Sequence, residues 1–455
     1  MSRHVIIGRL GSDDKLAVPT ATGEVATQLQ FVQATKRLDY GIGYALDDLA
    51  KLKIFPTETG VDLMILAAHV HAADTRISRE SESQDGWTRE IRLVVPVKDV
   101  ALWRDASTVL QRMLNFLTGD RWIIDFRSRP AGFEETVRSA PKELLGLPYE
   151  NLSLFSGGLD SLIGAVDELE QGKTPLLISH AGEGSVSGSQ NALFSRLQTQ
   201  YKNRGFERLR IWMEFPTKLI KDVSPEMTTR GRSFLFFAAG VFASTGFGDN
   251  VRLRVPENGL IALNVPLDEL RLGALSTRTT HPFYISRWNE LVRTLGMSTS
   301  IENPYWDKTK GEMVANCANL NFLASLIPDA MSCSSPTKAR WAGHGTQHCG
   351  FCLPCLIRRA AINAGLGKKD PTDYTLADLK AKVLDTKRAE GRQVRSFQFA
   401  IARLKKEPRL APILIHKPGS LAEESPTTLA DLAAVYSRGM AEVGKLLSGV
   451  ETTPS

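Results

Sequence analysis

The sequence predicts an α/β fold built on a doubly wound parallel sheet, with an α+β region before it and a helical extension after it. Three observations carry this prediction. Between about residues 150 and 264, short strands that are apolar on both faces alternate with helices. A Ser/Gly-rich turn joins the first of these strands to its helix, and four cysteines gather further along the chain.

The composition is that of an ordinary folded protein. The chain has 455 residues, of which 42% are hydrophobic and 23% charged, and its 34 aromatic residues (19 Phe, 7 Trp and 8 Tyr) need burial. These values exclude a mainly disordered chain, and five cysteines are too few for a disulfide scaffold. The net charge of +6 suits an anionic ligand such as a nucleotide, but it is too weak to favour direct nucleic-acid binding.

The chain is also expected to be a soluble protein of the reducing cytoplasm, with no membrane partner. The first 15 residues lack the apolar core of a signal peptide. The most apolar run, 234–243, is about half as long as a membrane span.

Residues 1–145 are expected to form an α+β domain that docks a partner or a substrate. A polar hairpin loop is expected at 78–86 and a linker at 139–148. His69 and His71 would lie on one strand face, where they could ligate a metal. Core packing is the better interpretation, because no cysteine or carboxylate pair accompanies them. The apolar patterns predict strands at 62–71, 89–97 and 121–127 and a helix at 101–117.

Residues 146–375 are expected to form the α/β domain, and 376–455 a polar helical extension. A break rich in Pro, Gly and Ser interrupts the extension at 417–428. In the α/β domain the sequence predicts strands at 150–155, 174–180, 209–215 and 259–264, and helices at 161–170, 191–203 and 233–245.

The first chemical signal is the stretch Leu154-Phe-Ser-Gly-Gly-Leu-Asp-Ser-Leu162. It lies where a strand meets a helix, and ligands of α/β sheets bind at such carboxyl ends. Gly157 and Gly158 let backbone N–H groups approach a phosphate, and Ser156 and Ser161 add hydroxyl donors. Asp160 can hold Mg²⁺ or cap the helix. The plainer alternative is a tight turn with an N-cap.

The second signal is a cluster of cysteines. Cys349, Cys352 and Cys355 follow one another at intervals of three, and Cys333 can complete a tetrahedral site. Four thiolates favour Zn²⁺, with an iron–sulfur cluster second and a redox disulfide between Cys349 and Cys352 third. His344 and His348 could replace a ligand but are expected to be loop residues, and Cys317 is expected to be a core residue.

The two signals in this order resemble the 7-cyano-7-deazaguanine synthases, the QueC family of the ATP-pyrophosphatase (PP-loop) superfamily, over roughly residues 150–375. Phe155-Ser-Gly-Gly-Leu-Asp-Ser161 matches the family's ATP loop. Arg230-Gly-Arg-Ser-Phe-Leu-Phe236 is similar to its Pro-Gly-Arg-Asn helix start, with Arg232 at the arginine. Glu302-Asn-Pro with Thr309-Lys-Gly-Glu-Met-Val314 resembles its Glu-Thr-Pro and Lys-Ala-Glu-Ile segments, and the cysteines resemble its zinc site.

The chain departs from the family pattern in three places. The loop between Cys333 and Cys349 is longer than usual, and the family's Tyr-Pro-Asp-Cys segment is absent near 260–280. Ser179-His-Ala-Gly-Glu-Gly184 stands where the family has Tyr-Gly-Gln. Residues 1–145 and 376–455 have no counterpart in the minimal enzyme. Extended QueC-like proteins of this build resemble those of Qat-type bacterial anti-phage systems, which combine such a protein with an ATPase and a TatD-like nuclease.

The resemblance implies a ligase that forms AMP and pyrophosphate, using ATP, Mg²⁺ and a structural Zn²⁺. The carboxylate of 7-carboxy-7-deazaguanine would be adenylated and then converted to an amide or a nitrile. Ser156, Asp160, Ser161 and Arg232 are the implied catalytic residues, although Arg232 is equally well interpreted as a surface cation. Arg278 and His281 could line the pocket. The implied zinc ligands are Cys333, Cys349, Cys352 and Cys355, and the implied nucleotide-binding residues are Leu154, Phe155, Ser156, Gly157, Gly158, Leu159, Asp160 and Ser161.

The amine acceptor stays open between ammonia and a partner protein. Because the chain carries large segments outside the catalytic unit, we expect transfer of the deazaguanine acid to the N-terminus of a partner in a defence complex. An α-amine, with a pKa of about 7.7–8.0, is partly neutral at pH 7, whereas Lys at about 10.4 is not. Two other classes remain: a nucleobase- or tRNA-modifying PP-loop ligase or thiolase, and a non-catalytic nucleotide-binding subunit.

Overall fold

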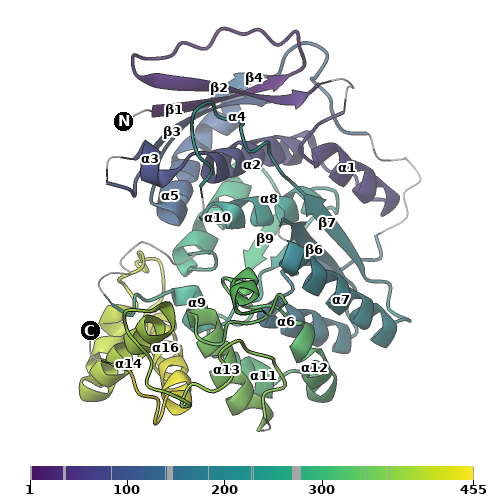
Figure 1. Ribbon diagram of the computed structural model, residues 1–455. Helices are drawn as coiled ribbons and strands as arrows, with labels where there is room; N and C mark the ends of the chain where they lie inside the picture. The colour runs from purple at the N-terminus through teal and green to yellow at the C-terminus, as the bar shows by residue number, and fades with distance from the viewer. Residues whose placement is uncertain are drawn as a thin grey trace.

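The protein is described by a computed structural model, in which two parallel β-sheets lie one above the other with helices between and around them (Figure 1). The structure describes residues 3–33, 37–83, 85–138, 140, 147–182, 184–226, 228, 230–268, 278–343, 345–367 and 369–453. Within these residues, no helix combines the length and the apolar character that a membrane span requires.

The N-terminal sheet has the strand order β2-β1-β3-β4, and every neighbouring pair is parallel. The expected α+β arrangement is therefore wrong here, because no neighbouring strands form a hairpin, and helices connect β2 to β3 and β3 to β4. The stretch at 78–86, expected to be a hairpin loop, contains a short helix instead. The elements of this region are β1 (Arg3–Leu10), β2 (Glu24–Val32), α1 (Ile42–Lys51), α2 (Glu58–Arg76), α3 (Arg79–Glu82), β3 (Glu90–Val97), α4 (Val100–Asp105), α5 (Ser107–Thr118) and β4 (Arg121–Ser128).

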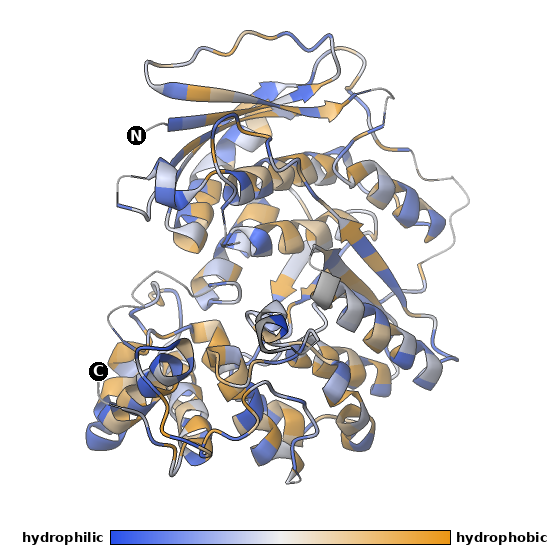
Figure 2. Ribbon diagram, viewed as in Figure 1, coloured by the Kyte–Doolittle hydropathy of each residue, from blue (hydrophilic) through white to orange (hydrophobic). Residues whose placement is uncertain are grey.

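The expected strand at 62–71 is a helix, α2. Its N-cap is Thr57, whose side chain accepts a hydrogen bond from the backbone N–H of Gly60. Every residue of α2 from Gly60 to Thr75 is buried, because the helix packs on β3 on one side and on α8 (Arg232–Ser244) on the other. The apolar residues of α2 and α8 lie between the two sheets (Figure 2). A helix buried all round shows no helical period, so its sequence reads like a buried strand.

The second sheet has the order β7-β6-β5-β8-β9 and is also entirely parallel. This confirms the predicted α/β class, with strands close to three of the four expected ranges. The fourth, at 259–264, is wrong: it is the short helix α9, which Asn258 caps by accepting the N–H of Ile261. The elements are β5 (Asn151–Leu154), α6 (Leu159–Glu170), β6 (Pro175–Ala181), α7 (Gly184–Gln200), β7 (Glu207–Trp212), α8, β8 (Val251–Arg254), α9 (Gly259–Leu263), α10 (Pro282–Thr294) and β9 (Thr299–Glu302).

The C-terminal part of the described chain is helical, as expected, and packs on the α/β unit through α9 and α13. Residues of these two helices share one hydrophobic core with α14 and α16. The last three residues of the expected break, 426–428, are the first residues of α16, whose N-cap is Ser425. The elements are α11 (Lys310–Ala315), α12 (Leu320–Leu326), α13 (Leu353–Leu366), α14 (Ala389–Lys406), α15 (Ala411–Leu414) and α16 (Pro426–Leu446), with 3₁₀ turns at Ile327–Asp329, Pro336–Ala342 and Pro408–Leu410.

Candidate functional site

The candidate site lies where the strand order of the second sheet reverses. β5 is flanked on one side by β6, the next strand in the chain. On its other side lies β8, which comes three strands after β5 in the chain. The loops that leave the carboxyl ends of β5 and β8 therefore diverge to opposite sides and leave a crevice between them. Ligands of open α/β sheets bind in such a crevice. The residues from Ser156 to Ser161 follow β5, and Glu257 and Asn258 follow β8.

The loop after β5 has a backbone suited to an anion. Gly157 has a φ of +82°, a conformation that favours glycine. Gly158, the N-cap residue of α6, supplies no side-chain cap; Ser332 accepts the N–H of Leu159, which leaves the N–H groups of Asp160 and Ser161 for a ligand. Ser156 is exposed, and its Oγ lies 3.1 Å from the Oγ of Ser161. The loop thus brings two hydroxyls to the N-terminus of α6.

Asp160 points into the protein rather than into solvent. Its Oδ1 lies 3.0 Å from the ammonium of Lys310, and its Oδ2 accepts hydrogen bonds from the backbone and the side-chain amide of Asn258, at 3.2 and 2.7 Å. Burial opposes ionisation, but Lys310 and these donors hold the pKa of Asp160 below its ordinary value. Burial and the adjacent Asp160 carboxylate raise the pKa of Glu257 well above its ordinary value.

Sequence reasoning did not assign Lys310, Asn258 and Glu257 to the site. They meet the loop only because β8 lies beside β5, and β9 beside β8, in the folded sheet. A local signal did exist for Lys310: it is the first residue of α11, behind Thr309, which forms a capping box with Glu312.

The C-terminal helix α16 supports the segment that carries Lys310. Glu442 of α16 accepts hydrogen bonds from the hydroxyl of Thr309 and from the backbone N–H of Gly311. Arg438, one turn earlier, donates to Glu312 at 2.6 Å. The helical extension therefore holds the residues on both sides of Lys310.

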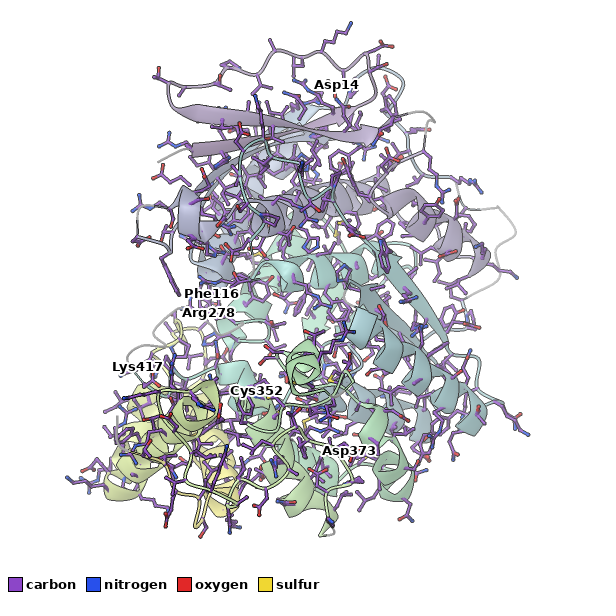
Figure 3. All side chains as sticks on the ribbon, in the orientation of Figure 1. Asp14, Phe116, Arg278, Cys352, Asp373 and Lys417 are labelled. Carbon is purple, nitrogen blue, oxygen red and sulfur yellow. The ribbon has the colours of Figure 1, made fainter. Side chains whose placement is uncertain are left out.

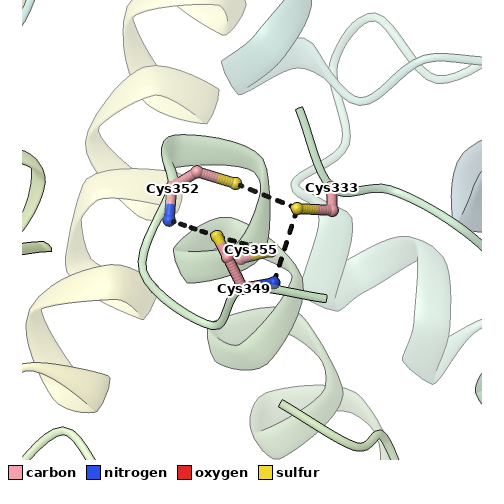
Figure 4. Close-up of side chains that lie close together, drawn as sticks. All are labelled: Cys333, Cys349, Cys352 and Cys355. Atoms are coloured by element: carbon pink, nitrogen blue, oxygen red, sulfur yellow. Dashed lines mark hydrogen bonds between the residues drawn. The ribbon is translucent and has the colours of Figure 1, made fainter. Parts of the chain in front are cut away.

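The four clustered cysteines gather at one point, as Figure 4 shows. Their sulfur atoms all lie within 4.8 Å of one another, with Cys333 3.9 Å from Cys352 and Cys349 3.8 Å from Cys355. Zn–S bonds of about 2.3 Å at tetrahedral angles separate two sulfurs by about 3.8 Å. The cluster could therefore hold a single metal ion such as zinc. An iron–sulfur cluster would place several atoms between the thiolates and hold them further apart.

The other cysteine and histidine candidates that the structure describes lie outside this cluster of four sulfur atoms. All five cysteines are free thiols, so no disulfide joins Cys349 to Cys352. Cys317 is buried in the core beside α6, as expected. His348 is not placed as a ligand, because its Nε2 accepts the N–H of Ser332 at 3.2 Å. His344 lies outside the described residues.

The cysteine cluster is connected directly to the loop after β5. Met331 donates its N–H to the carbonyl of Gly157 at 2.9 Å, and the Oγ of Ser332 accepts the N–H of Leu159 at 3.3 Å. Cys333 is the next residue along the chain. A metal that fixes Cys333 would therefore also fix the two residues that hold the loop.

Arg232, the fourth expected catalytic residue, is the first residue of α8 and lines a cavity beside the loop. The same cavity is lined by His71 of α2 and His180 of β6. His69 and His71 do not share a strand face, as the sequence suggested, because α2 is a helix. The Nε2 of Gln190 donates to the carbonyls of both Ser156 and His180 at 3.2 Å, which ties the cavity to the loop.

Arg278 and His281 lie elsewhere. Arg278 stacks on the ring of Phe116 in α5 and donates to the Phe116 carbonyl at 2.8 Å, and Figure 3 shows these two side chains together. His281 is the N-cap of α10 and accepts the N–H of Phe283. Their placement indicates a packing role.

A scan against protein-family models and a search of curated proteins give no match for this chain. The chemistry of the site therefore has to be argued from its own residues.

Proposed function

We propose that the chain is an ATP-dependent ligase that activates a carboxylic acid as its adenylate, releasing pyrophosphate. The observation that carries the proposal is the Ser156–Ser161 loop at the switch point of the sheet, with its positive-φ glycine and the N-terminus of α6. Such a loop binds the phosphates of a nucleotide through backbone N–H groups and hydroxyls.

In the proposed reaction an oxygen of the substrate carboxylate attacks the α-phosphorus of ATP. The bond from the α-phosphorus to the bridging oxygen breaks, and pyrophosphate leaves with the electron pair. Ser156, Ser161 and the first turn of α6 would stabilise the negative charge that builds on the leaving group. Lys310, whose ammonium lies buried 3.0 Å from Asp160, adds a positive charge next to the loop. An amine then attacks the acyl-adenylate, forming the C–N bond and releasing AMP.

The residues at the loop also fit a magnesium ion that enters with ATP. Carboxylate oxygens are ligands that Mg²⁺ prefers, and Asp160 supplies them here. Its Oδ1 faces the ammonium of Lys310 at 3.0 Å. Asp160 is thus the residue that would hold the ion, which would offset charge on the phosphates.

The four cysteines are proposed to hold one structural Zn²⁺. Four thiolates fill a tetrahedral shell and leave no open position for substrate. Its role would be to fix Met331 and Ser332 against the loop, as the hydrogen bonds of these two residues indicate.

The identity of the acid follows from the QueC resemblance alone. The proposed substrate is 7-carboxy-7-deazaguanine, and the proposed setting is an anti-phage complex in the cytoplasm. The proposed acceptor is the N-terminal amine of a partner protein, for which the regions flanking the α/β unit would provide the contact surface.

Mass spectrometry of the products tests the proposed reaction. The chain is incubated with ATP, Mg²⁺ and 7-carboxy-7-deazaguanine, with and without ammonia, beside Asp160→Asn and the exposed control Asp13→Asn. We expect an acyl-adenylate or an amide with the wild type and the control, and at least about tenfold less with Asp160→Asn. No acid-derived product in any arm would refute the proposed ligase.

Intact-mass measurement of co-expressed partner proteins tests the acceptor. A partner that gains the deazaguanine acyl mass only with a chain carrying Asp160 supports conjugation. Accumulation of free nitrile with unmodified partners would show that ammonia is the acceptor.

A further inference from the structure

The C-terminal half of α2, which belongs to the N-terminal region, reaches the carboxyl edge of the second sheet. There it faces a cavity of about 170 Å³ that opens beside β6 and β7. Residues from both parts of the chain line this cavity, among them His71, Thr75 and Arg76 of α2, His180 of β6, Trp212 of β7 and Arg232 of α8. The wall formed by α2 lies outside the part of the chain that resembles the QueC family.

The contacts that hold α2 in this place are specific. The Nε of Arg76 donates to the carbonyl of Pro216 at 2.9 Å, which fixes the chain after β7. Asp74 accepts the N–H of Gly231 at 2.7 Å, immediately before Arg232. Asp74 is itself paired with Arg89 in a buried network of charges. α2 therefore lines the cavity and also sets the position of the α8 N-terminus.

The cavity contains a buried polar atom that no described residue satisfies. His71 is 8% exposed, and its Nδ1 has no hydrogen-bond partner among the described residues. His180 is 3% exposed, and the backbone of Met213 lies at hydrogen-bonding distance from its ring. Buried polar atoms in native proteins normally have partners, so Nδ1 of His71 indicates a polar ligand in the cavity. Burial lowers the pKa of His71 and of His180 to about 3, so both rings are neutral at pH 7. Each then offers one donor and one acceptor.

The size and charge of the cavity restrict the ligand. A cavity of about 150 Å³ holds one benzene ring, so about 170 Å³ accepts one planar ring system, and any further part of the ligand would extend out of the open side. Among the described residues that line the cavity, Arg232 and Arg76 are cations and Glu214 is a carboxylate. The ring that fits therefore carries donors and acceptors on its edge and an anionic group.

We propose that this cavity, with α2 as one wall, binds the heteroaromatic ring of an anionic ligand, and that His71 is a specificity-determining residue contributed by the N-terminal region. Gln190 connects the cavity to the Ser156–Ser161 loop, so a ring in the cavity and a phosphate on the loop can belong to one site. This inference deepens the proposed function and rests on it for the choice of probes. A purine ring of ATP and the ring of a deazapurine acid share the required chemistry.

Calorimetric titration of the full chain distinguishes these sources. The probes are α,β-methylene-ATP, 7-carboxy-7-deazaguanine and, for the loop alone, tripolyphosphate. We expect His71→Leu to weaken binding of one ring-bearing probe by at least tenfold and to leave tripolyphosphate within twofold. The probe that weakens identifies the ring that occupies the cavity, and His71→Gln should recover part of the affinity.

His69→Leu is the matched control, because His69 lies on the same helix but packs on Phe31 of the N-terminal sheet. Trp212→Leu provides a second test at an exposed position, 52% accessible, where the substitution leaves the core intact. Trp212→Leu should weaken the same probe as His71→Leu. Unchanged binding of both ring-bearing probes, or equal weakening of tripolyphosphate, would overturn the inference. Binding of the acid without any binding of the ATP analogue would support the cavity while refuting the proposed ligase.

Discussion

Replacing Lys310 by methionine removes the ammonium that faces Asp160 while keeping most of the side-chain volume. At 3.0 Å and an effective dielectric constant of about 20, the two charges attract each other by about 5–6 kcal/mol. Desolvation of the two buried side chains offsets much of this attraction. Removing one partner leaves the desolvation of the other uncompensated, so Lys310→Met is expected to destabilise the fold by about 3–5 kcal/mol. Asp160→Asn is expected to cost a similar amount.

A double-mutant cycle measures the pair itself. The double variant Asp160→Asn/Lys310→Met leaves neither charge buried without a partner. Its loss of unfolding free energy should therefore be smaller than the sum of the two single losses by at least about 2 kcal/mol. The assay is urea unfolding, combined with hydrogen exchange in peptides that cover α6 and α11. The exposed pair Arg196 and Asp329 is the control, with an expected coupling below about 1 kcal/mol. Single losses for Asp160 and Lys310 that add within about 0.5 kcal/mol would refute the reasoning.

Two further predictions concern the metal and pH. Elemental analysis should find about one zinc per chain. Cys352→Ser should lose the zinc and increase hydrogen exchange at 330–365, because structural zinc contributes folding energy. A wild-type chain with neither zinc nor iron would contradict this prediction. Acidification from pH 7.5 to 5.5 should lower the free energy of unfolding by about 6 kcal/mol. Burial lowers the pKa of five imidazoles, to about 4 for His69 and to about 3 for His71, His180, His281 and His348. Over this pH range the unfolded chain takes up protons that these imidazoles do not, at about 1.4 kcal/mol each, and Asp62, whose pKa is raised to about 6, offsets about 1 kcal/mol. A urea midpoint that does not change between these pH values would refute this prediction.

The sequence predicted the second sheet better than the first. β5, β6 and β7 are short apolar runs bounded by turns, a pattern that a buried parallel strand shares with few other elements. α2 was taken for a strand because it is buried on all sides, and only its length of 19 residues favours a helix. β8 was not predicted because its four residues, Val-Arg-Leu-Arg, alternate apolar and charged side chains over too short a stretch to stand out as an apolar run.

In the candidate site, too, local sequence motifs are predicted better than contacts between distant parts of the chain. The Ser/Gly loop and the cysteines are local motifs, and the structure brings each set together as the spacing suggested. Lys310, Asn258 and His71 reach the site from three separate parts of the chain. Their proximity depends on strand order and on packing of α2 against α8, which no local pattern encodes.

The position at which the chain cleaves ATP tests the central claim most directly. The chain is incubated with α-labelled ATP, Mg²⁺, 7-carboxy-7-deazaguanine and ammonia as the amine, and the labelled product is identified. We predict AMP with an equal amount of pyrophosphate. Ser156→Ala should reduce AMP formation by at least about tenfold, and Ser195→Ala, an exposed serine of α7, should leave it unchanged. Labelled ADP as the initial product, or full AMP formation by Ser156→Ala, would contradict the account.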